Sequence, residues 1–246
     1  MEFQNNMDWF QSWFDTPQYH ILYKDRNTEE AKEFVINLHN YLMLRDGAKV
    51  WDLCCGKGRH ALLMNKLGWN VVATDLSQNS IEFASAYKND QLDFMVHDMR
   101  QPFYVNYFEA VFNLFTSFGY FEKESENEKV IQSVYDSLKP NGCVVIDFFN
   151  SNYVVNRLNP FEVKVVEDIE FTIQRKIENN RVLKTISFFE NGIKNSYQEV
   201  VSLLDQRYFQ NLLEKLNFKN FRFFGDYQLS DFNIAESPRL IIIAYK

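Results

Sequence analysis

The sequence predicts an α/β protein built on a doubly wound, mostly parallel sheet of seven strands. From residue 47 onward, short apolar runs alternate with helical patterns, which is typical of strand–helix–strand units in a buried parallel sheet. Hydrophobic residues make up 46% of the 246-residue chain and aromatic residues 17%, which excludes a disordered chain. At this length we expect one α/β domain that carries an insertion.

Helical segments are expected ahead of the sheet. Residues 9–23 are dense in aromatic side chains and are interrupted by Pro17, so we expect one or two short helices there. Between residues 28 and 44 the apolar side chains recur every three or four positions. This spacing predicts an amphipathic helix.

Strands and helices are expected to alternate strictly in the first part of the sheet. The predicted strands span 49–54, 69–74, 92–96, 110–115 and 143–148, and the predicted helices span 59–67, 78–87 and 124–138. Pro140-Asn141-Gly142 predicts a turn that closes the last of these helices.

The alternation stops between about residues 161 and 204, where the pattern predicts antiparallel hairpins. Strand-like runs at 163–166, 171–176, 182–189 and 196–203 are separated by Glu178-Asn179-Asn180 and Glu190-Asn191-Gly192. A helical pattern returns at 207–216 and is followed by apolar runs at 218–224 and 240–245. The hairpins are therefore predicted to be an insertion into the α/β domain, which the last helix and strands complete.

Composition narrows the classes of partner. A net charge of −7 and a sequence pI of about 5.2 count against nucleic acid as a partner. Two of the three cysteines, Cys54 and Cys55, are adjacent, which suits neither a disulfide framework nor a metal site, so we expect no metal and a reducing compartment. No run approaches the roughly 20 apolar residues that span a bilayer, and the chain does not open on a signal-peptide pattern. We predict a cytoplasmic protein, monomeric or homodimeric, with no membrane contact.

A glycine-containing turn follows the first predicted strand. Open α/β sheets bind ligands at the carboxyl ends of their strands, and a helix that starts there offers free N–H groups. The turn lacks the Gly-x-Gly-x-x-Gly spacing that accommodates a dinucleotide, although Asp75 could serve a dinucleotide ribose equally well. Asp52, at the end of the strand, would repel phosphates but suit a ligand ammonium. These features favour a cationic amino-acid ligand over a dinucleotide.

The same turn carries a family resemblance. The segment Asp52-Leu53-Cys54-Cys55-Gly56-Lys57-Gly58 resembles the first motif of small-molecule class I methyltransferases that use S-adenosylmethionine (SAM), with Cys54 in place of the first glycine. Arg59-His60-Ala61 is similar to the extension found in many of them. The resemblance covers about residues 28–150. It implies a Rossmann-like methyltransferase fold and an enzyme that binds SAM and releases S-adenosylhomocysteine.

The resemblance also implies which residues bind SAM. Asp52 faces the methionine ammonium, while Cys54, Gly56 and Gly58 form the turn beneath the ligand. The remaining implied contacts are Asp75 and Leu76 at the ribose, His97, Asp98 and Met99 at the adenine, Asn113 and Phe115 under the methionine part, and Tyr23 and Arg26 near its carboxylate. Several alternatives stay open: Asp52 could partner a helix N-terminus, Asp75 could cap the helix that begins near Ser77, Asp98 could form a turn, and Cys54 and Cys55 could serve packing alone.

By the same resemblance we expect four segments. They are an N-terminal helical lid at 1–46, the SAM-binding core at 47–156, an antiparallel insertion on the acceptor side at 157–204, beside Asp147, Phe148, Phe149 and Asn150, and the C-terminal part of the core at 205–246. The candidate general bases are His20 and Tyr19 in the lid, then Tyr23 and His97. For His20, a packed or surface position is the competing interpretation.

The predicted reaction is an in-line displacement that passes the methyl group to a nitrogen or oxygen of a small molecule. Aromatic side chains in the insertion favour a ring-bearing or cationic methylamine acceptor, although they could equally form a core. The alternatives are a SAM-binding regulatory module without activity and a tRNA or protein methyltransferase. Asn113-Leu114-Phe115-Thr116 departs from the Asn/Asp-Pro-Pro-aromatic motif of enzymes that methylate amino groups of bases.

Overall fold

The computed structural model describes residues 9–24 and 28–246, and the chain divides into two compact units. Residues 27–156 together with 204–246 form the first, which we call the α/β unit. The described residues of 1–26 together with 157–203 form the second, which we call the antiparallel unit.

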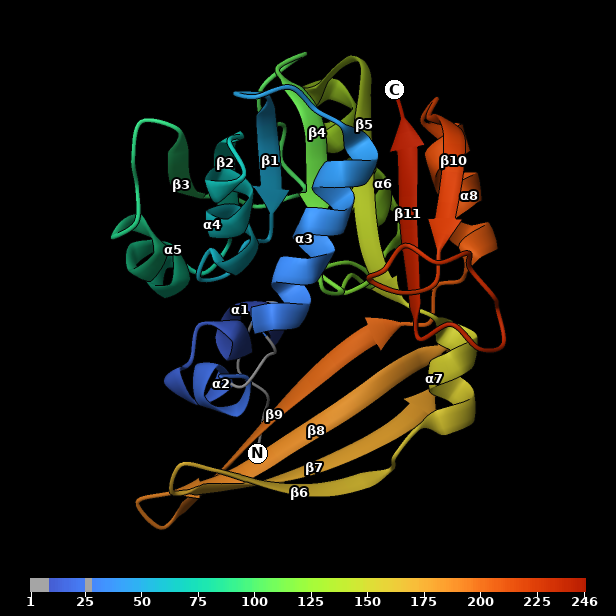
Figure 1. Cartoon of the computed structure of the whole chain (residues 1–246). Coiled ribbons are helices and arrows are strands. Elements are labelled where there is room, and N and C mark those ends of the chain that lie inside the picture. The colour runs from blue at the N-terminus through green and yellow to red at the C-terminus, as the bar shows by residue number, and fades with distance from the viewer. Residues whose placement is uncertain (1–8, 25–27) are drawn as a thin grey trace. The chain divides into compact units, whose positions relative to one another are not determined.

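The α/β unit is built on a sheet of seven strands in the order β10-β11-β5-β4-β1-β2-β3 (Figure 1). All neighbours among β1 to β5 are parallel, whereas β11 lies antiparallel between β5 and β10. This arrangement confirms the predicted fold class. The strands are β1 (Lys49–Leu53), β2 (Asn70–Asp75), β3 (Leu92–Val96), β4 (Phe108–Asn113), β5 (Leu138–Phe149), β10 (Lys219–Phe224) and β11 (Arg239–Tyr245).

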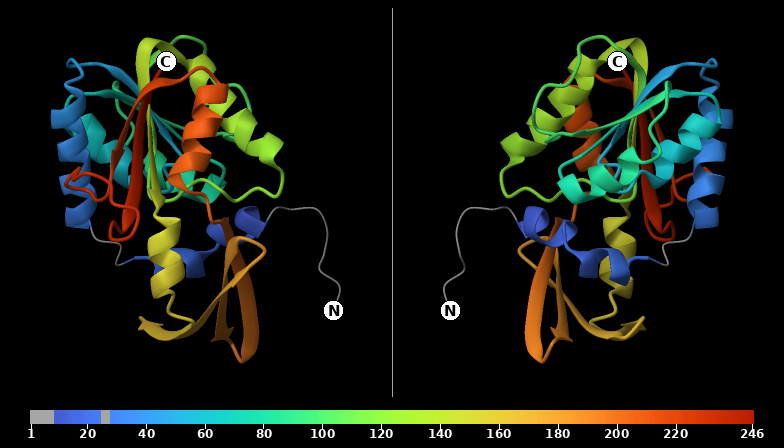
Figure 2. Two further views of the ribbon diagram at one scale, coloured as in Figure 1. Left: turned by 90° about the vertical axis from the view of Figure 1, so that its right-hand side faces the viewer. Right: turned by 90° about the vertical axis from the view of Figure 1, so that its left-hand side faces the viewer.

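Helices cover both faces of this sheet. Helices α3 (Thr28–Leu42) and α4 (Arg59–Lys66) lie on one face, and α6 (Glu124–Ser137) and α8 (Gln206–Lys215) lie on the other (Figure 2). Apolar residues of α5 (Gln78–Ser85) join the core cluster of α3 and α4. The sequence did not predict the short helix α7 (Ser151–Arg157). None of the helices within the described residues has the length and apolar character to cross a bilayer.

One predicted turn is wrong. Pro140–Gly142 lies inside β5, because Leu138 already pairs with Phe108 of β4 as soon as α6 ends. The segment is an irregular stretch of strand: Asn141 has φ +65°, and the pairing register shifts between Phe108 and Ala110.

The antiparallel unit contains a four-stranded sheet in the order β6-β7-β8-β9 (Figure 1). Its strands are β6 (Phe161–Val166), β7 (Ile169–Glu178), β8 (Arg181–Glu190) and β9 (Ile193–Ser202), all joined by two-residue loops. Asn179 and Asn180 both have positive φ, as do Asn191 and Gly192. Positive φ at both central residues is the geometry of the tight hairpin turn that suits twisted strands, and this confirms the predicted hairpins.

One face of this second sheet carries the helices α1 (Trp9–Phe14) and α2 (Pro17–Leu22). Helix α2 starts where the Thr16 side chain accepts a hydrogen bond from the Tyr19 N–H and where Pro17 occupies the first turn. Trp13 and Leu22 pack with side chains of β7 and β8, namely Phe171, Ile173, Ile186 and Phe188. Because side chains alternate along a strand, the other face of the sheet carries a separate set of residues.

Candidate functional site

The turn between β1 and α4 has a backbone shape that requires small residues. Cys54, Gly56 and Gly58 all have positive φ, at +66°, +55° and +82°. A Cβ added at Gly58 would lie 2.7 Å from Cε1 of Phe94, so only glycine fits there. At Gly56, by contrast, no described atom lies within 4 Å of the position a Cβ would take. The peptide at Gly56 is therefore open to a ligand that approaches the turn.

Asp52 is a buried acid at the end of β1. Its side chain is 1% exposed, and the backbone N–H of Ala61 in α4 donates to it. The Oδ2 atom has no hydrogen-bond partner among the described residues. Burial raises the pKa of Asp52 to about 7, and the nearby Asp75 adds to the increase, while Ala61 and Arg59 oppose it. A ligand cation placed at Oδ2 would stabilise the ionised carboxylate, and none of the described residues donates a hydrogen bond to this atom.

Asp75 ties the turn to the end of β2. Its Oδ2 accepts from the Gly56 N–H at 2.8 Å, and its Oδ1 accepts from the Ser77 N–H at 2.9 Å. The side chain of Ser77, not that of Asp75, caps helix α5. An ionised carboxylate has about four acceptor positions, so Asp75 can still accept from ligand hydroxyls. Leu76, between these two residues, is partly exposed at the same edge.

The segment after β3 is organised by Arg100. Its guanidinium contacts Asp98, with a shortest N···O distance of 2.7 Å, and also binds Glu126 of α6 at 2.8 Å. Partial burial raises the pKa of Asp98, but hydrogen bonds from Arg100 outweigh this and leave the pKa below its usual value. Asp98 therefore stays ionised and can still accept a hydrogen bond from a ligand. The buried Met99 places its Sδ 3.5 Å from Sγ of Cys54, which joins this segment to the turn.

His97 is less suited to act as a base. Its ring packs 4.5 Å from the ring of Phe103 and 6.0 Å from that of Trp51, and its Nε2 lies 3.2 Å from the carbonyl oxygen of Gln101. Burial lowers the pKa of His97. The lowered pKa makes the imidazole a weaker base, and its neighbours hold the ring in place.

The segment after β4 is strained. Phe115 and Thr116 both have φ +62°, a conformation that a β-branched residue such as threonine rarely adopts. Asn113, 3% exposed, donates to the carbonyl oxygens of Leu53 and Ser117 and so joins this segment to the end of β1. The segment thus lies beside the end of β1, where Asp52 is located.

Asp147 and Arg239 hold the strained segment in place. The Asp147 carboxylate accepts from the Phe115 N–H at 2.8 Å, and its backbone carbonyl accepts from the Thr116 N–H at 2.9 Å. Arg239 binds Asp147 at 2.6 Å and donates to Oγ1 of Thr116 at 2.9 Å. Tyr227 also donates to Asp147, at 3.2 Å. Asp147 is 1% exposed, so this ion pair is largely withdrawn from water.

The sequence-based prediction missed Arg239 and placed Asp147 only as a residue beside the acceptor site. The one available signal for Arg239 is its position at the start of a predicted apolar strand, directly after Pro238. Because β11 is antiparallel to β5, that start lies at the carboxyl edge of the parallel strands, opposite Phe149. The sequence pattern alone did not reveal the direction of β11.

The lid candidates belong to the antiparallel unit. Tyr19 lies against the rings of Trp13 and Tyr23, at 5.6 and 4.9 Å, and His20 is its neighbour in α2. The Tyr23 hydroxyl donates to Glu199 at 2.7 Å and accepts from Lys184. Arg26 lies outside the described residues. The residues that the structure brings together at one place are those of the α/β unit: Asp52, Cys54, Gly56, Gly58, Asp75, Met99, Asn113 and Phe115.

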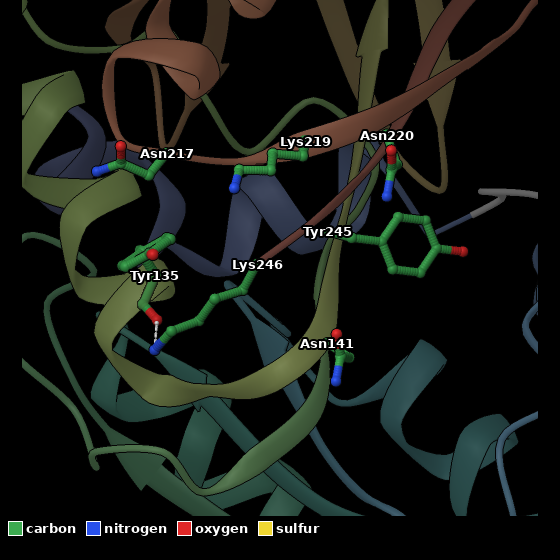
Figure 3. Close-up of a pocket in the computed structure, with 7 residues that line it drawn as sticks. All are labelled: Tyr135, Asn141, Asn217, Lys219, Asn220, Tyr245 and Lys246. Atoms are coloured by element: carbon green, nitrogen blue, oxygen red, sulfur yellow. Dashed lines mark hydrogen bonds between the residues drawn. The ribbon is translucent and has the colours of Figure 1, made fainter.

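A pocket of about 490 Å³ lies at the opposite edge of the same sheet (Figure 3). Its three asparagines, Asn141, Asn217 and Asn220, all have positive φ, so the backbone turns account for their presence. The Lys246 ammonium donates to the carbonyl oxygen of Tyr135 (Figure 3). It also donates to the carbonyl oxygen of Leu138. The polar groups of this pocket are thus explained by local structure. Within the described part of the chain, no cluster of His, Cys, Asp and Glu could hold a metal ion.

Comparison with known proteins agrees with the geometry of this edge. Residues 50–142 match the family model of a methyltransferase domain. A glycine/sarcosine N-methyltransferase of Parasynechococcus marenigrum (strain WH8102) is 27% identical over 203 residues, which cover 76% of this chain and 69% of that protein.

Solved structures share the fold. An S-adenosylmethionine-dependent methyltransferase from Clostridium acetobutylicum ATCC 824 superposes with a TM-score of 0.75 at 16% identity, over 92% of this chain and 94% of the other. The SAM-bound amino pentose methyltransferase CalS10 from Micromonospora echinaspora superposes with a TM-score of 0.66 at 15% identity, over 99% of each chain.

The residues at the carboxyl edge fit SAM. The unpartnered oxygen of Asp52 suits an ammonium, Gly56 leaves room for a ligand against the backbone, and Asp75 and Asp98 keep acceptor positions for a nucleoside. Together with the matching family model and relatives, this shows that the chain is an enzyme that uses SAM as its cofactor. Residues 50–142 of the chain match the methyltransferase family, and the chain has the fold of the class I SAM-dependent methyltransferases.

Proposed function

We propose that this enzyme methylates an amine nitrogen of a small molecule. One observation favours nitrogen over oxygen as the acceptor atom. Apart from Asp52, which we assign to the SAM ammonium, the acids and the histidine described at the edge of the α/β unit already have partners within the protein. Asp98 and Asp147 are ion-paired with arginines, Asp75 holds the turn, and His97 packs against Phe103. A hydroxyl acceptor needs a base, whereas a neutral amine attacks through its own lone pair.

The names of the relatives point in the same direction. The similar proteins include a glycine/sarcosine N-methyltransferase and an amino pentose methyltransferase. Both act on small molecules that carry an amine. The net charge of −7 also suits an acceptor that is positively charged or neutral better than a polyanion.

In this proposal each acid at the sheet edge has one task toward SAM. Asp52 accepts hydrogen bonds from the methionine ammonium, Asp75 from the ribose hydroxyls and Asp98 from the adenine amine. The turn and its neighbours then supply the shape of the pocket. These residues are Cys54, Gly56 and Gly58 in the turn, Leu76, His97 and Met99 along the nucleoside, and Asn113 and Phe115 beneath the methionine part.

SAM supplies a methyl group that is already activated on a sulfonium. The work left to the chain is to orient the acceptor and to exclude water. The Asp147–Arg239 pair contributes by fixing the Phe115–Thr116 segment, which has little freedom to move while both peptide N–H groups are held. His20 and Tyr19 are the proposed acceptors of the proton that the methylated amine releases. Tyr23 and Arg26 are the proposed contacts of the methionine carboxylate. We expect Arg26 to contribute more to SAM binding, because the Tyr23 hydroxyl already donates its proton to Glu199.

Calorimetry with SAM tests the binding half of the proposal. We expect Asp52→Asn to weaken SAM binding at least tenfold at pH 8, because the variant cannot offer an anion to the ammonium. The matched control is Asp90→Asn, which removes an exposed carboxylate from the same unit. Equal affinities for the two variants would remove Asp52 from the site.

Acceptors that differ only in carrying an amine or a hydroxyl group test whether the methyl group goes to nitrogen. The enzyme and SAM are incubated with glycine against glycolate and with an amino sugar against its parent sugar, and S-adenosylhomocysteine and methylated product are followed by mass spectrometry. We expect turnover with at least one amine and with neither hydroxyl partner. Methylation of a hydroxyl partner would overturn the choice of nitrogen. Tight SAM binding without turnover on any amine would instead favour a SAM-binding module that lacks activity.

A further inference from the structure

Strand β6 forms an open edge of the four-stranded sheet. It pairs with β7 on one side, and no strand of the described chain pairs with its other side. The Pro160 carbonyl accepts from the Arg175 N–H at 2.9 Å, which fixes the hydrogen-bonding phase of the ladder. Even-numbered residues of β6 therefore bond to β7, and the N–H and C=O groups of Phe161, Val163 and Val165 point outward.

The side chains of these three residues are exposed as well. Phe161 is 54% exposed, Val163 48% and Val165 65%. They lie on the face of the sheet opposite to the one that packs against α1 and α2, since Val166 belongs to that buried cluster and neighbouring residues alternate. The Phe161 N–H already donates to Oδ1 of Asn159 at 3.3 Å, whereas the outward groups of Val163 and Val165 have no such bond to a described residue. An edge that offers unpaired backbone groups and apolar side chains favours pairing with another strand.

The opposite edge of the same sheet differs. By the hydrogen bond from the Leu203 N–H to the Asn180 carbonyl, the outward-facing groups of β9 belong to its even-numbered residues, which include Lys194, Ser196 and Gln198. These side chains are polar and exposed. Native sheets commonly protect their edges in this way. Of the two edge strands, β6 is therefore the one suited to pair with another strand.

We infer that β6 pairs antiparallel with β6 of a second copy of this chain, around a two-fold axis at Val163. In its sequence Phe161-Glu162-Val163-Lys164-Val165, an apolar residue lies two positions from Val163 on each side, and residues of opposite charge lie one position away on either side. Val163 then lies opposite Val163 of the second copy, Glu162 opposite Lys164, and Phe161 opposite Val165. Every outward N–H and C=O between Phe161 and Val165 then pairs across the two copies, with the Phe161 N–H exchanging its bond to Asn159 for one to the second strand. The two sheets become one continuous antiparallel sheet.

Charge selects this register over its neighbours. A shift of two residues in one direction places Glu162 opposite Glu162, and a shift in the other direction places Lys164 opposite Lys164. Like charges directly opposite destabilise an antiparallel pair. A shift of one residue places buried-face residues opposite exposed-face residues. In the inferred register, Glu162 and Lys164 fall in the closer, non-hydrogen-bonded type of pair, where opposite charges attract most.

The contacts that these two residues already make are compatible with the pairing. Glu162 binds Arg175 at 2.6 Å, and its second oxygen can accept a further donor. Lys164 donates to the Leu22 carbonyl at 3.2 Å, and its ammonium has further protons. A single edge pairing is at the small end of protein interfaces, so the dimer is expected to be weak and dependent on concentration.

Sedimentation equilibrium of the full chain tests the inference, with one proline variant at each edge of the sheet. We expect the mass to rise from 29.4 kDa toward twice that value as the concentration increases. Val163→Pro removes an outward N–H and leaves the bonds to β7 intact, so it should hold the mass at 29.4 kDa. Gln198→Pro makes the same change on the β9 edge and should behave as the unmodified chain does. A chain that stays monomeric at its solubility limit, or a Val163→Pro variant that still dimerises, would overturn the inference.

A charge exchange supplies a second test that does not depend on proline. Glu162→Lys and Lys164→Glu each create like-charge pairs across the two-fold axis and should raise the dimer dissociation constant at least tenfold. The double variant restores opposite charges and should return to within a few-fold of the unmodified chain. Circular dichroism and SAM affinity confirm that each variant is folded. A double variant as weak as the single ones would show the inferred register to be wrong.

Discussion

The two sheets of this chain bury their strands in different ways. In the α/β unit, β1 and β2 are buried along nearly their whole length, so that Val50, Trp51 and Val71 are completely enclosed. In the antiparallel unit, burial alternates along β6 and β7. A sheet that is covered on both faces can present chemistry only at the ends of its strands. A sheet that is covered on one face keeps its other face and its edges for contact with other molecules.

Backbone strain follows the same division. The non-glycine residues with positive φ in the antiparallel unit lie in its hairpin turns, and three of them are asparagines, which tolerate this conformation. In the α/β unit, Phe115 and Thr116 adopt the same region although their side chains disfavour it. Local sequence explains the first group, and tertiary contacts from Asp147 and Arg239 hold the second. Strain that distant residues maintain is typical of functional sites.

The largest effect should come from Arg239→Ala. Removal of one partner from a buried ion pair costs about 3–5 kcal/mol of unfolding free energy, because the remaining charge is left unpaired. Release of Thr116 should also weaken SAM binding. The matched change in the other unit is Lys184→Ala, which should cost less because Glu199 keeps the hydrogen bonds from Trp13 and Tyr23. Urea denaturation measures the unfolding free energy of both variants. Equal losses would contradict the larger contribution that we expect from Arg239.

Alanine substitutions of one glycine in each unit should have the next largest effects. Gly58→Ala places a methyl group 2.7 Å from Phe94 in a left-handed conformation, so we expect a loss of about 2–4 kcal/mol in stability and of most SAM affinity. Gly192→Ala adds a methyl group to a left-handed hairpin residue with no described atom within 4 Å of it. It should cost about 1–2 kcal/mol of strain and leave SAM binding unchanged. Calorimetry of both variants separates the binding effect from the strain.

Much of the fold could be predicted because its patterns are local. Buried parallel strands appear as continuous apolar runs, and the two asparagine-containing turns mark the hairpins. The candidate site followed from the rule that ligands bind at strand ends, which placed Asp52 and Asp75 at one edge. The structure places the two acids close enough for the charge of Asp75 to raise the pKa of Asp52, and the Gly56 N–H ties Asp75 to the turn.

Long-range pairings could not be predicted in this way. Arg239 and Asp147 are 92 residues apart, and their contact depends on the antiparallel direction of β11. Tyr23 and Glu199 are 176 residues apart and meet only because α2 packs on the sheet of the same unit. The turn predicted at Pro140–Gly142 failed for a similar reason, since pairing with β4 overrides the local preference.

The pH dependence of SAM binding should show the burial of Asp52. With a pKa of about 7, the carboxyl group loses its charge as the pH falls below that value, so SAM affinity should fall about tenfold per pH unit between pH 7 and 5. Asp52→Asn should remove this slope. A slope that persists in Asp52→Asn would assign it to another group.

Ionisation of Asp52 should affect stability in the opposite direction to SAM affinity. The folded pKa lies above the ordinary value of 3.8, so the folded state holds the proton more tightly than the unfolded state does. The contribution of Asp52 to the unfolding free energy is full below about pH 4 and is lost as the pH rises through 7. Without SAM, Asp52→Asn should therefore raise the melting temperature at pH 8 relative to the unmodified chain, and the gain should shrink at pH 5. No gain at pH 8 would mean that the buried charge carries little penalty.

The smallest effect should come from Cys54→Gly. Cys54 has φ +66°, where a non-glycine residue pays about 1 kcal/mol of strain, and glycine relieves that strain while it gives the unfolded chain more freedom. We expect the two terms to offset within about 1 kcal/mol and SAM affinity to stay within about twofold. Cys54→Val, with a branched side chain in the same conformation, should lose about 1–2 kcal/mol and some affinity. The turn requires the backbone conformation at Cys54 and not its thiol. A large loss of stability or of SAM affinity in Cys54→Gly would therefore show that the contact between Sγ of Cys54 and Met99 also contributes.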